Sequence, residues 1–86
     1  MDKRHEDFAK AIAAELRAER AAQQATYEAL AERMDSNPGT LYKYFSGKRA
    51  LPLGTFSAVC DALGVDPMTI GQRAQQRLQE RGGQDS

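Results

Sequence analysis

Apolar residues recur every three or four positions along most of the chain, which is the spacing of an amphipathic helix. In the stretch 5–23 they lie among alanines and long charged side chains, whose high helix propensity predicts one long helix. A second stripe predicts a short helix over about 27–34, with Thr26 as its N-cap. The inward positions are Phe8, Ile12 and Leu16 in the first helix, and Leu30, Ala31 and Met34 in the second.

Proline and glycine divide the rest of the chain into three further helices. Asn37-Pro38 is typical of an N-cap followed by the first helical position, so a third helix is expected over 38–46, ended by Gly47. Because proline disfavours a helical conformation in the residue before it, the second helix must end ahead of this pair. The inward positions of the third helix are Leu41, Tyr44 and Phe45.

The fourth predicted helix is closed by Gly64, and Asp66-Pro67 starts a fifth with another cap and proline pair. The fifth helix fades into 82–86, which we expect to be a disordered tail. No strand signal is present, so the predicted fold is all-α, with one five-helix domain over residues 1–81. The inward positions are Leu53, Phe56, Val59, Cys60 and Leu63 in the fourth helix, and Ile70, Ala74 and Leu78 in the fifth.

Length and composition limit the class of protein. The chain has 86 residues, enough for one modest hydrophobic core and too few for a second. It contains no apolar run that would span a membrane or act as a signal peptide, so we expect a cytoplasmic protein. The single cysteine, Cys60, cannot form an internal disulfide, which fits a reducing compartment, and it is expected to be a small core residue.

The charges are balanced in number but not in position. The chain has 12 basic and 12 acidic side chains, which counts against strong nonspecific nucleic-acid binding. Residues 36–60, however, contain Lys43, Lys48 and Arg49 and no acid, whereas acids outnumber bases on both sides of this window. The positive field is therefore concentrated around the third predicted helix and the loop that follows it.

Four segments carry a resemblance to a known family. They are Thr26–Met34 (TYEALAERM), Asn37–Leu41 (NPGTL), Ser46–Pro52 (SGKRALP) and Ala62–Pro67 (ALGVDP). In this order and spacing, the chain resembles the lambda-repressor-like helix-turn-helix domains over about residues 8–72. The resemblance implies a compact five-helix fold in which the second and third helices form the helix-turn-helix, with the third helix in the major groove of double-stranded DNA.

One of these helices also resembles a second family. Gly39–Phe45 (GTLYKYF) is similar to the recognition-helix motif of the tetracycline-repressor family. That family adds a large ligand-binding helical domain, for which this chain has no room, and the segment Leu63–Pro67 favours the lambda-repressor-like family. Both resemblances imply that the same helix contacts DNA.

The start of the third helix departs from the lambda-repressor-like pattern. Pro38 and Gly39 occupy positions where that family usually places base-reading side chains, so the bidentate reading of adenine by glutamine is out of reach there. Gly39 would instead let the backbone approach the groove closely. The alternative is that this pair only starts a helix. The residues left for base readout are Asn37, Thr40, Tyr42 and Lys43.

Further candidates flank the recognition helix. Ser46, Lys48 and Arg49 match the segment that contacts the DNA backbone in the resembled family, where the residue at the Arg49 position also reaches bases. Tyr27 replaces the glutamine that usually opens the second helix. The Tyr27 hydroxyl, together with Thr26 and the helix N-terminus, is suited to bind a phosphate. The alternative for 46–49 is a solvated basic loop.

These features lead to two hypotheses of different classes. The first is a sequence-specific transcriptional regulator, a repressor that binds a palindromic operator as a homodimer through 70–78 and the C-terminal tail, with half-sites about 34 Å apart. The second is a helix-turn-helix scaffold that binds protein, as an antitoxin or an antagonist of another regulator, and the missing base readers and the zero net charge favour it. With His5 as the only histidine and no nucleophile–base set, we expect no enzyme, metal or cofactor.

Overall fold

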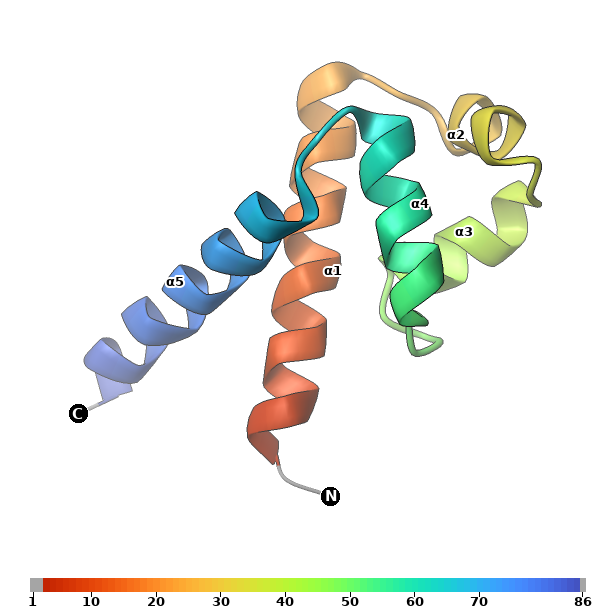
Figure 1. Ribbon diagram of the computed structural model, residues 1–86. Helices are drawn as coiled ribbons and strands as arrows, with labels where there is room; N and C mark the ends of the chain where they lie inside the picture. Colours follow the sequence, from red (N-terminus) through yellow and green to blue (C-terminus); the bar gives the residue numbers. More distant parts are fainter. Residues whose placement is uncertain (1–2, 86) are drawn as a thin grey trace.

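The computed structural model describes the backbone of residues 3–85 and the side chains of residues 5–80. This part of the chain forms five α-helices and no strand (Figure 1). The helices are α1 (Lys3–Gln23), α2 (Tyr27–Met34), α3 (Pro38–Phe45), α4 (Leu53–Leu63) and α5 (Pro67–Asp85). The prediction of an all-α, five-helix fold is therefore confirmed. No helix among the described residues is long and apolar enough to cross a membrane.

Helix α5 differs from the sequence-based expectation at its end. The tail over 82–86 was expected to be disordered, but α5 continues through Gly82 and Gly83 to Asp85. Ser86 lies outside the described residues. The physical reason is that glycine retains its backbone N–H and carbonyl. It weakens a helix by only about 1 kcal/mol relative to alanine, whereas proline would interrupt the helix.

Helix α1 occupies the centre of the arrangement. Helix α5 packs along one side of α1, while α3 and α4 contact α1 from another direction (Figure 1). Helix α2 packs against α3 and α4 and has no comparable contact with α5. The pair α2–α3 is thus held against the rest of the molecule by α1 and α4.

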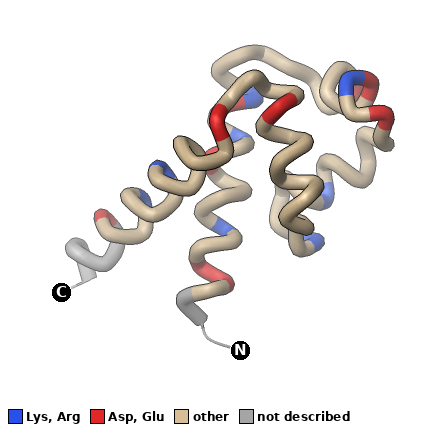
Figure 2. Tube along the Cα trace, in the orientation of Figure 1, with Lys and Arg blue, Asp and Glu red and all other residues tan. Residues whose placement is uncertain are grey.

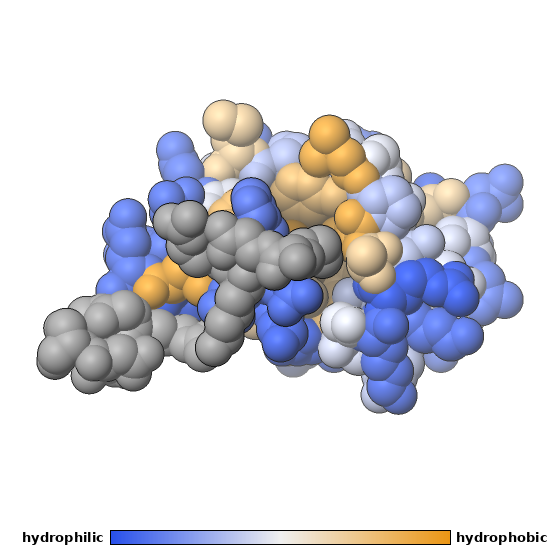
Figure 3. All heavy atoms as spheres, turned by 90° about the horizontal axis from the view of Figure 1, so that it is seen from below, coloured by the Kyte–Doolittle hydropathy of each residue, from blue (hydrophilic) through white to orange (hydrophobic). Residues whose placement is uncertain are grey.

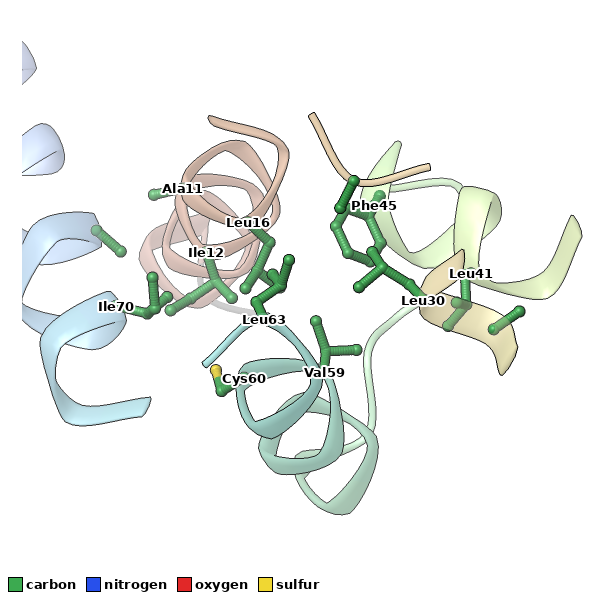
Figure 4. Packing of buried hydrophobic residues seen from close by; sticks show 13 residues of the cluster. Ala11, Ile12, Leu16, Leu30, Leu41, Phe45, Val59, Cys60, Leu63 and Ile70 are labelled. Carbon is green, nitrogen blue, oxygen red and sulfur yellow. The ribbon is translucent and has the colours of Figure 1, made fainter. Parts of the chain in front are cut away.

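The core lies where the five helices face one another, and α2 contributes Leu30 and Ala31 to it. Ile12 and Leu16 of α1 point toward Leu63 of α4, and Ile70 of α5 lies beside them (Figure 4). Phe45 of α3 is fully buried in the same cluster. Burying a leucine, isoleucine or phenylalanine side chain contributes about 1.5–3 kcal/mol, so this cluster dominates the packing of the helices.

Six residues assigned to the core by their spacing are not fully enclosed: Phe8 and Leu53 are exposed, and Met34, Tyr44, Phe56 and Leu78 are only partly buried. Leu53, the first residue of α4, is 81% exposed, and Phe8 is 38% exposed. Tyr44 is half-buried and packs against the edge of the core. The spacing of apolar residues shows which face of a helix turns inward, but not how far a neighbouring helix extends along that face. At Leu53, no described residue covers the first turn of α4.

Side chains from other helices satisfy carbonyls at the ends of α3 and α4. Arg17 Nη1 of α1 donates to the Phe45 carbonyl at 2.6 Å, and Gln23 Nε2 of α1 donates to the Leu63 carbonyl at 2.7 Å. Arg33 Nη1 of α2 donates to the carbonyl of Ala62 at 2.9 Å. The last carbonyls of a helix have no partner within it, so these bonds also fix how the helices are oriented relative to one another.

Two ion pairs join α1 to α5. Glu15 Oε1 lies 2.9 Å from Arg77 Nη2, and Glu19 Oε1 lies 2.8 Å from Arg73 Nη1. The Arg73 guanidinium, as the main cause, and the side-chain amide of Gln23 hold the pKa of Glu19 below its usual range by hydrogen bonding. Both pairs are partly exposed, so each adds less than about 1 kcal/mol to packing that is mainly apolar.

Candidate nucleic-acid interface

The turn between α2 and α3 is held by backbone hydrogen bonds. Asp35 ends α2 in the left-handed conformation, with φ 52° and ψ 49°, and its N–H donates to carbonyls of the last turn of α2. Ser36 N–H donates to the carbonyl of Ala31 at 2.8 Å. Aspartate is one of the few residues besides glycine that adopts this conformation readily. The three-residue turn 35–37 therefore places α3 directly after α2 as a helix-turn-helix unit.

Asn37 caps the N-terminus of α3. Its Oδ1 atom accepts hydrogen bonds from the N–H groups of Gly39 at 2.8 Å and Thr40 at 3.3 Å. A side chain at Gly39 would bring a Cβ to 3.1 Å from that oxygen, so glycine suits the close approach of the cap. With Oδ1 occupied, the exposed Asn37 amide retains its NH₂ group, which only donates.

A chain of aromatic and basic side chains connects α1, α2, α3 and the loop after α3. The Tyr27 ring of α2 meets the Tyr42 ring edge-on, with centroids 5.7 Å apart, and the Phe45 ring in the same way at 5.3 Å. The Arg20 guanidinium of α1 lies 4.5 Å from the Tyr27 centroid, and Lys48 Nζ lies 5.4 Å from the Tyr42 centroid. Both distances are within the range of cation–π attraction, so the rings hold a cation at each end of the chain.

The C-terminal end of α3 gathers a second group of predicted residues. Ser46 Oγ donates to the Lys43 carbonyl at 3.2 Å, and the backbone N–H of Arg49 donates to the same carbonyl at 3.2 Å. Gly47 has φ 80°, a conformation that glycine adopts without strain and that turns the chain after α3. The loop that carries Lys48 and Arg49 is thereby folded back against the end of the helix.

The structure brings most of the predicted residues onto one surface. Tyr27, Tyr42 and Lys48 meet through the aromatic chain, and Lys43, Ser46 and Arg49 meet at the end of α3. Thr26 Oγ1 accepts from the Ala29 N–H at 3.0 Å and caps α2, while Asn37 caps α3 at the opposite end from Ser46. None of the predicted residues is buried. The exposed ones are Thr26, Asn37, Gly39, Tyr42, Lys43, Lys48 and Arg49, and the half-buried ones are Tyr27, Pro38, Thr40 and Ser46.

The charge on α3 and on the loop that follows it has one sign. Along α3 and the loop to Pro52 the charged residues are Lys43, Lys48 and Arg49, whereas α2 carries both signs (Figure 2). None of these three cations forms an ion pair with another described residue. A phosphate or other anion would therefore meet uncompensated positive charge here.

Sequence reasoning missed two arginines of α1 that belong to this surface. Arg20 stacks on Tyr27 while its Nη1 donates to the Ala25 carbonyl at 2.9 Å, and its buried Nε has no hydrogen-bond partner. Arg17 holds the last carbonyl of α3. Neither has a local signal, because the groups they contact lie on elements that reach α1 only through the tertiary fold.

A known protein-family model matches most of this five-helix chain. Residues 11–70 match the model of a helix-turn-helix domain, from within α1 to the first turn of α5. The chain belongs to the helix-turn-helix domain family. Two solved structures resemble this helix-turn-helix protein closely, and both are of the clp gene regulator ClgR from Corynebacterium glutamicum. No protein with a curated description matches the sequence.

The likeness to ClgR extends over nearly the whole fold. In the first ClgR structure, 28% of residues are identical, the TM-score is 0.75, and the alignment covers 81% of this chain and 91% of that one. In the second, 27% are identical, the TM-score is 0.80, and the coverage is 91% and 83%. Family membership and the likeness to a regulator of the lambda-repressor-like type confirm the resemblance seen in the sequence. Together they support a role in DNA-binding transcription regulation.

Proposed function

We propose that this helix-turn-helix protein is a sequence-specific transcriptional repressor whose helix α3 enters the major groove of DNA. The observation that carries the proposal is the exposed face of α3 and its following loop. This face bears Lys43, Lys48 and Arg49 without an acid, and it belongs to the helix-turn-helix formed by α2, the turn 35–37 and α3. An α-helix fits the major groove, and uncompensated cations supply the salt-dependent part of the affinity.

In this arrangement, the side-chain groups available to read the bases are mainly hydrogen-bond donors. The Oδ1 of Asn37 is occupied by the cap, so the Asn37 NH₂ group and Lys43 are suited to donate to acceptors such as guanine O6 and N7. The exposed Tyr42 ring is available for contact with a thymine methyl group. The missing side chain at Gly39 lets the start of α3 come close to the edges of the bases.

Phosphate contacts would set the register on both sides of α3. Thr26 Oγ1 uses a lone pair in the cap of α2 but still has a hydroxyl proton to donate. The hydroxyl of Tyr27 lies at the same helix start. Lys48 and Arg49 would hold the backbone beyond the other end of α3. Such contacts position a protein without reading sequence.

We propose further that the protein acts as a homodimer through α5. Ile70 and Ala74 are fully buried against α1, so the contact between copies must use other residues than the inward stripe of 70–78. Met68, which is 71% exposed, and the glutamines that follow it on α5 line a groove of about 890 Å³ shared with α1 and α4. No lining residue of this groove is charged, so two copies related by a two-fold axis would meet there without repulsion.

The test is selection of bound duplexes from a random pool with the full chain, followed by sequencing. A two-fold-symmetric motif with half-sites about one helical turn apart is expected. Lys43→Glu should remove the enrichment while leaving the helical circular-dichroism spectrum and the melting temperature unchanged. Absence of any enriched sequence, together with a stoichiometric protein that co-purifies, would replace this proposal with the protein-binding role of an antitoxin or antagonist.

A further inference from the structure

A second hollow lies behind the loop that follows α3. It has a volume of about 310 Å³ and lies between α1, α4 and residues 47–51. Its walls are apolar, formed mainly by Phe8, Ile12, Leu51 and Phe56, with Leu53 at its edge. Apolar side chains reach the surface on this underside of the molecule (Figure 3). The volume is at the lower end of the range for sites that enclose a small organic molecule.

The polar groups around this hollow favour a negative charge. Lys10 of α1 and Arg49 of the loop both line it, and both are exposed. None of its lining residues is acidic. Neither cation forms an ion pair with another described residue. Two unpaired cations from elements far apart in the sequence therefore meet at one apolar cavity.

The start of α4 adds to the same preference. Helix α4 begins at Leu53, on the edge of the hollow, and its cap residue Pro52 makes no side-chain hydrogen bond to the first turn. The first turn of α4 also has no acidic residue. A side chain added at Gly54, within this turn, would meet no atom within 4 Å. The free N–H groups of this turn carry partial positive charge.

We propose that this hollow binds a small organic anion, with a flat or branched apolar body inside and one carboxylate at the rim beside Lys10 and Arg49. The hollow shares Phe8, Ile12, Leu53 and Phe56 with the groove assigned to the dimer, but the side that carries Lys10 and Arg49 lies outside that groove. Because Arg49 and Gly47 also belong to the loop next to the recognition helix, the bound anion would engage a cation that DNA needs. The protein would thus release DNA when the anion accumulates; this consequence, but not the binding itself, rests on the proposed function.

The binding is tested without DNA, using 1-naphthoate as the probe and 1-naphthylmethanol as its neutral counterpart. Amide resonances of the full-length, ¹⁵N-labelled protein are followed by NMR as each compound is added up to millimolar concentration. We expect 1-naphthoate to shift Ala9, Lys10, Gly47 and Leu51. We also expect it to bind about five-fold more tightly than the alcohol, since each partly exposed charge pair contributes modestly.

Two substitutions and a matched control locate the probe. Lys10→Gln should reduce the preference for the carboxylate about two- to three-fold, whereas Lys48→Gln, which removes a neighbouring loop charge outside the cavity, should leave it unchanged. Ala9→Phe fills the hollow from an exposed helix position and should abolish the shifts of the loop amides without unfolding the domain.

Three results would overturn the proposal: equal affinity for the acid and the alcohol, an unchanged preference in Lys10→Gln, or shifts confined to the glutamines of α5. The DNA arm is separate. If wild-type protein binds its selected duplex, 1-naphthoate should raise the apparent Kd of wild type but not of Ala9→Phe. If no duplex is ever selected, the DNA-binding proposal fails while the NMR result still decides whether the hollow binds the anion.

Discussion

Asn37 combines a structural and a proposed functional role, and two substitutions separate them. Its Oδ1 caps α3 through the N–H groups of Gly39 and Thr40, while its NH₂ group belongs to an exposed side chain at the start of the proposed recognition helix. Asn37→Ala removes both groups. Asn37→Asp retains an acceptor of the same shape at the cap but replaces the donor by a negative charge. Comparing the stability of the two variants therefore tests the role of Asn37 as a cap. Comparing their affinity for DNA tests its role in the interface.

The expected change in the free energy of unfolding follows from the geometry of this cap. Replacing an asparagine N-cap by alanine costs about 1 kcal/mol. Both capped N–H groups are exposed, so water can take over the lost bonds and the cost should not exceed this value. For a domain of this size, 1 kcal/mol lowers the melting temperature by about 4–8 °C. Because the first turn of α3 contains no acid, Asn37→Asp should be neutral or stabilising by up to about 1 kcal/mol.

The assays are thermal unfolding followed by circular dichroism, and binding to the selected duplex at about 0.15 M salt, where the screening length is about 8 Å. Asn37→Ala should melt at lower temperature, and Asn37→Asp at the wild-type temperature or above. Both should bind DNA more weakly, and Asn37→Asp the more so. If the two variants lost equal stability, the cap assignment would be wrong. If Asn37→Asp kept wild-type DNA affinity, Asn37 would not lie at the interface.

Three further predictions concern the stability of the folded domain. Tyr27→Leu should destabilise the domain by about 1–3 kcal/mol in urea unfolding, through lost ring-edge and cation–π contacts, whereas Tyr27→Phe should keep stability within about 0.5 kcal/mol. Glu19→Gln should cost less than about 1 kcal/mol at neutral pH. The lowered pKa of Glu19 means that this difference disappears as pH falls through that pKa. Burial, with a smaller effect of Asp66, raises the pKa of Cys60 to about 11. The Cys60 thiol therefore ionises at a lower pH in the unfolded chain than in the folded one. Stability should fall between about pH 9 and pH 11 by up to about 3 kcal/mol, and Cys60→Ala should lack this decline.

The helix boundaries could be predicted because they depend on local chemistry. Asn37-Pro38 and the Gly64 stop act through caps and fixed dihedral angles, which need no knowledge of the rest of the molecule. The same holds for the exposed positions of Lys43 and Tyr42, which follow from the helical period once Leu41 and Phe45 are assigned to the core. These are the parts of the candidate interface that sequence alone could place.

The parts that sequence could not place depend on contacts between distant segments. Arg20 meets Tyr27 only because α1 and α2 fold back across the short linker after Gln23, and Arg17 meets the Phe45 carbonyl across 28 positions. The exposure of Leu53 likewise depends on where the neighbouring helices stop. The spacing of apolar residues along one helix carries no information about contacts between distant segments. The contacts of Arg17 and Arg20 around α3 could therefore be found only from the structure.

The distribution of charge resolves the apparent conflict between a neutral chain and a nucleic-acid interface. On α1 and α5, Glu15 and Glu19 are neutralised by Arg77 and Arg73, and these pairs join the two helices. The cations of α3 and its loop have no such partners among the described residues. Screening in physiological salt acts over about 8 Å, so a phosphate at α3 responds to the local cations more than to the total charge. The zero sum therefore argues against nonspecific binding by the whole surface, and not against docking by this one face.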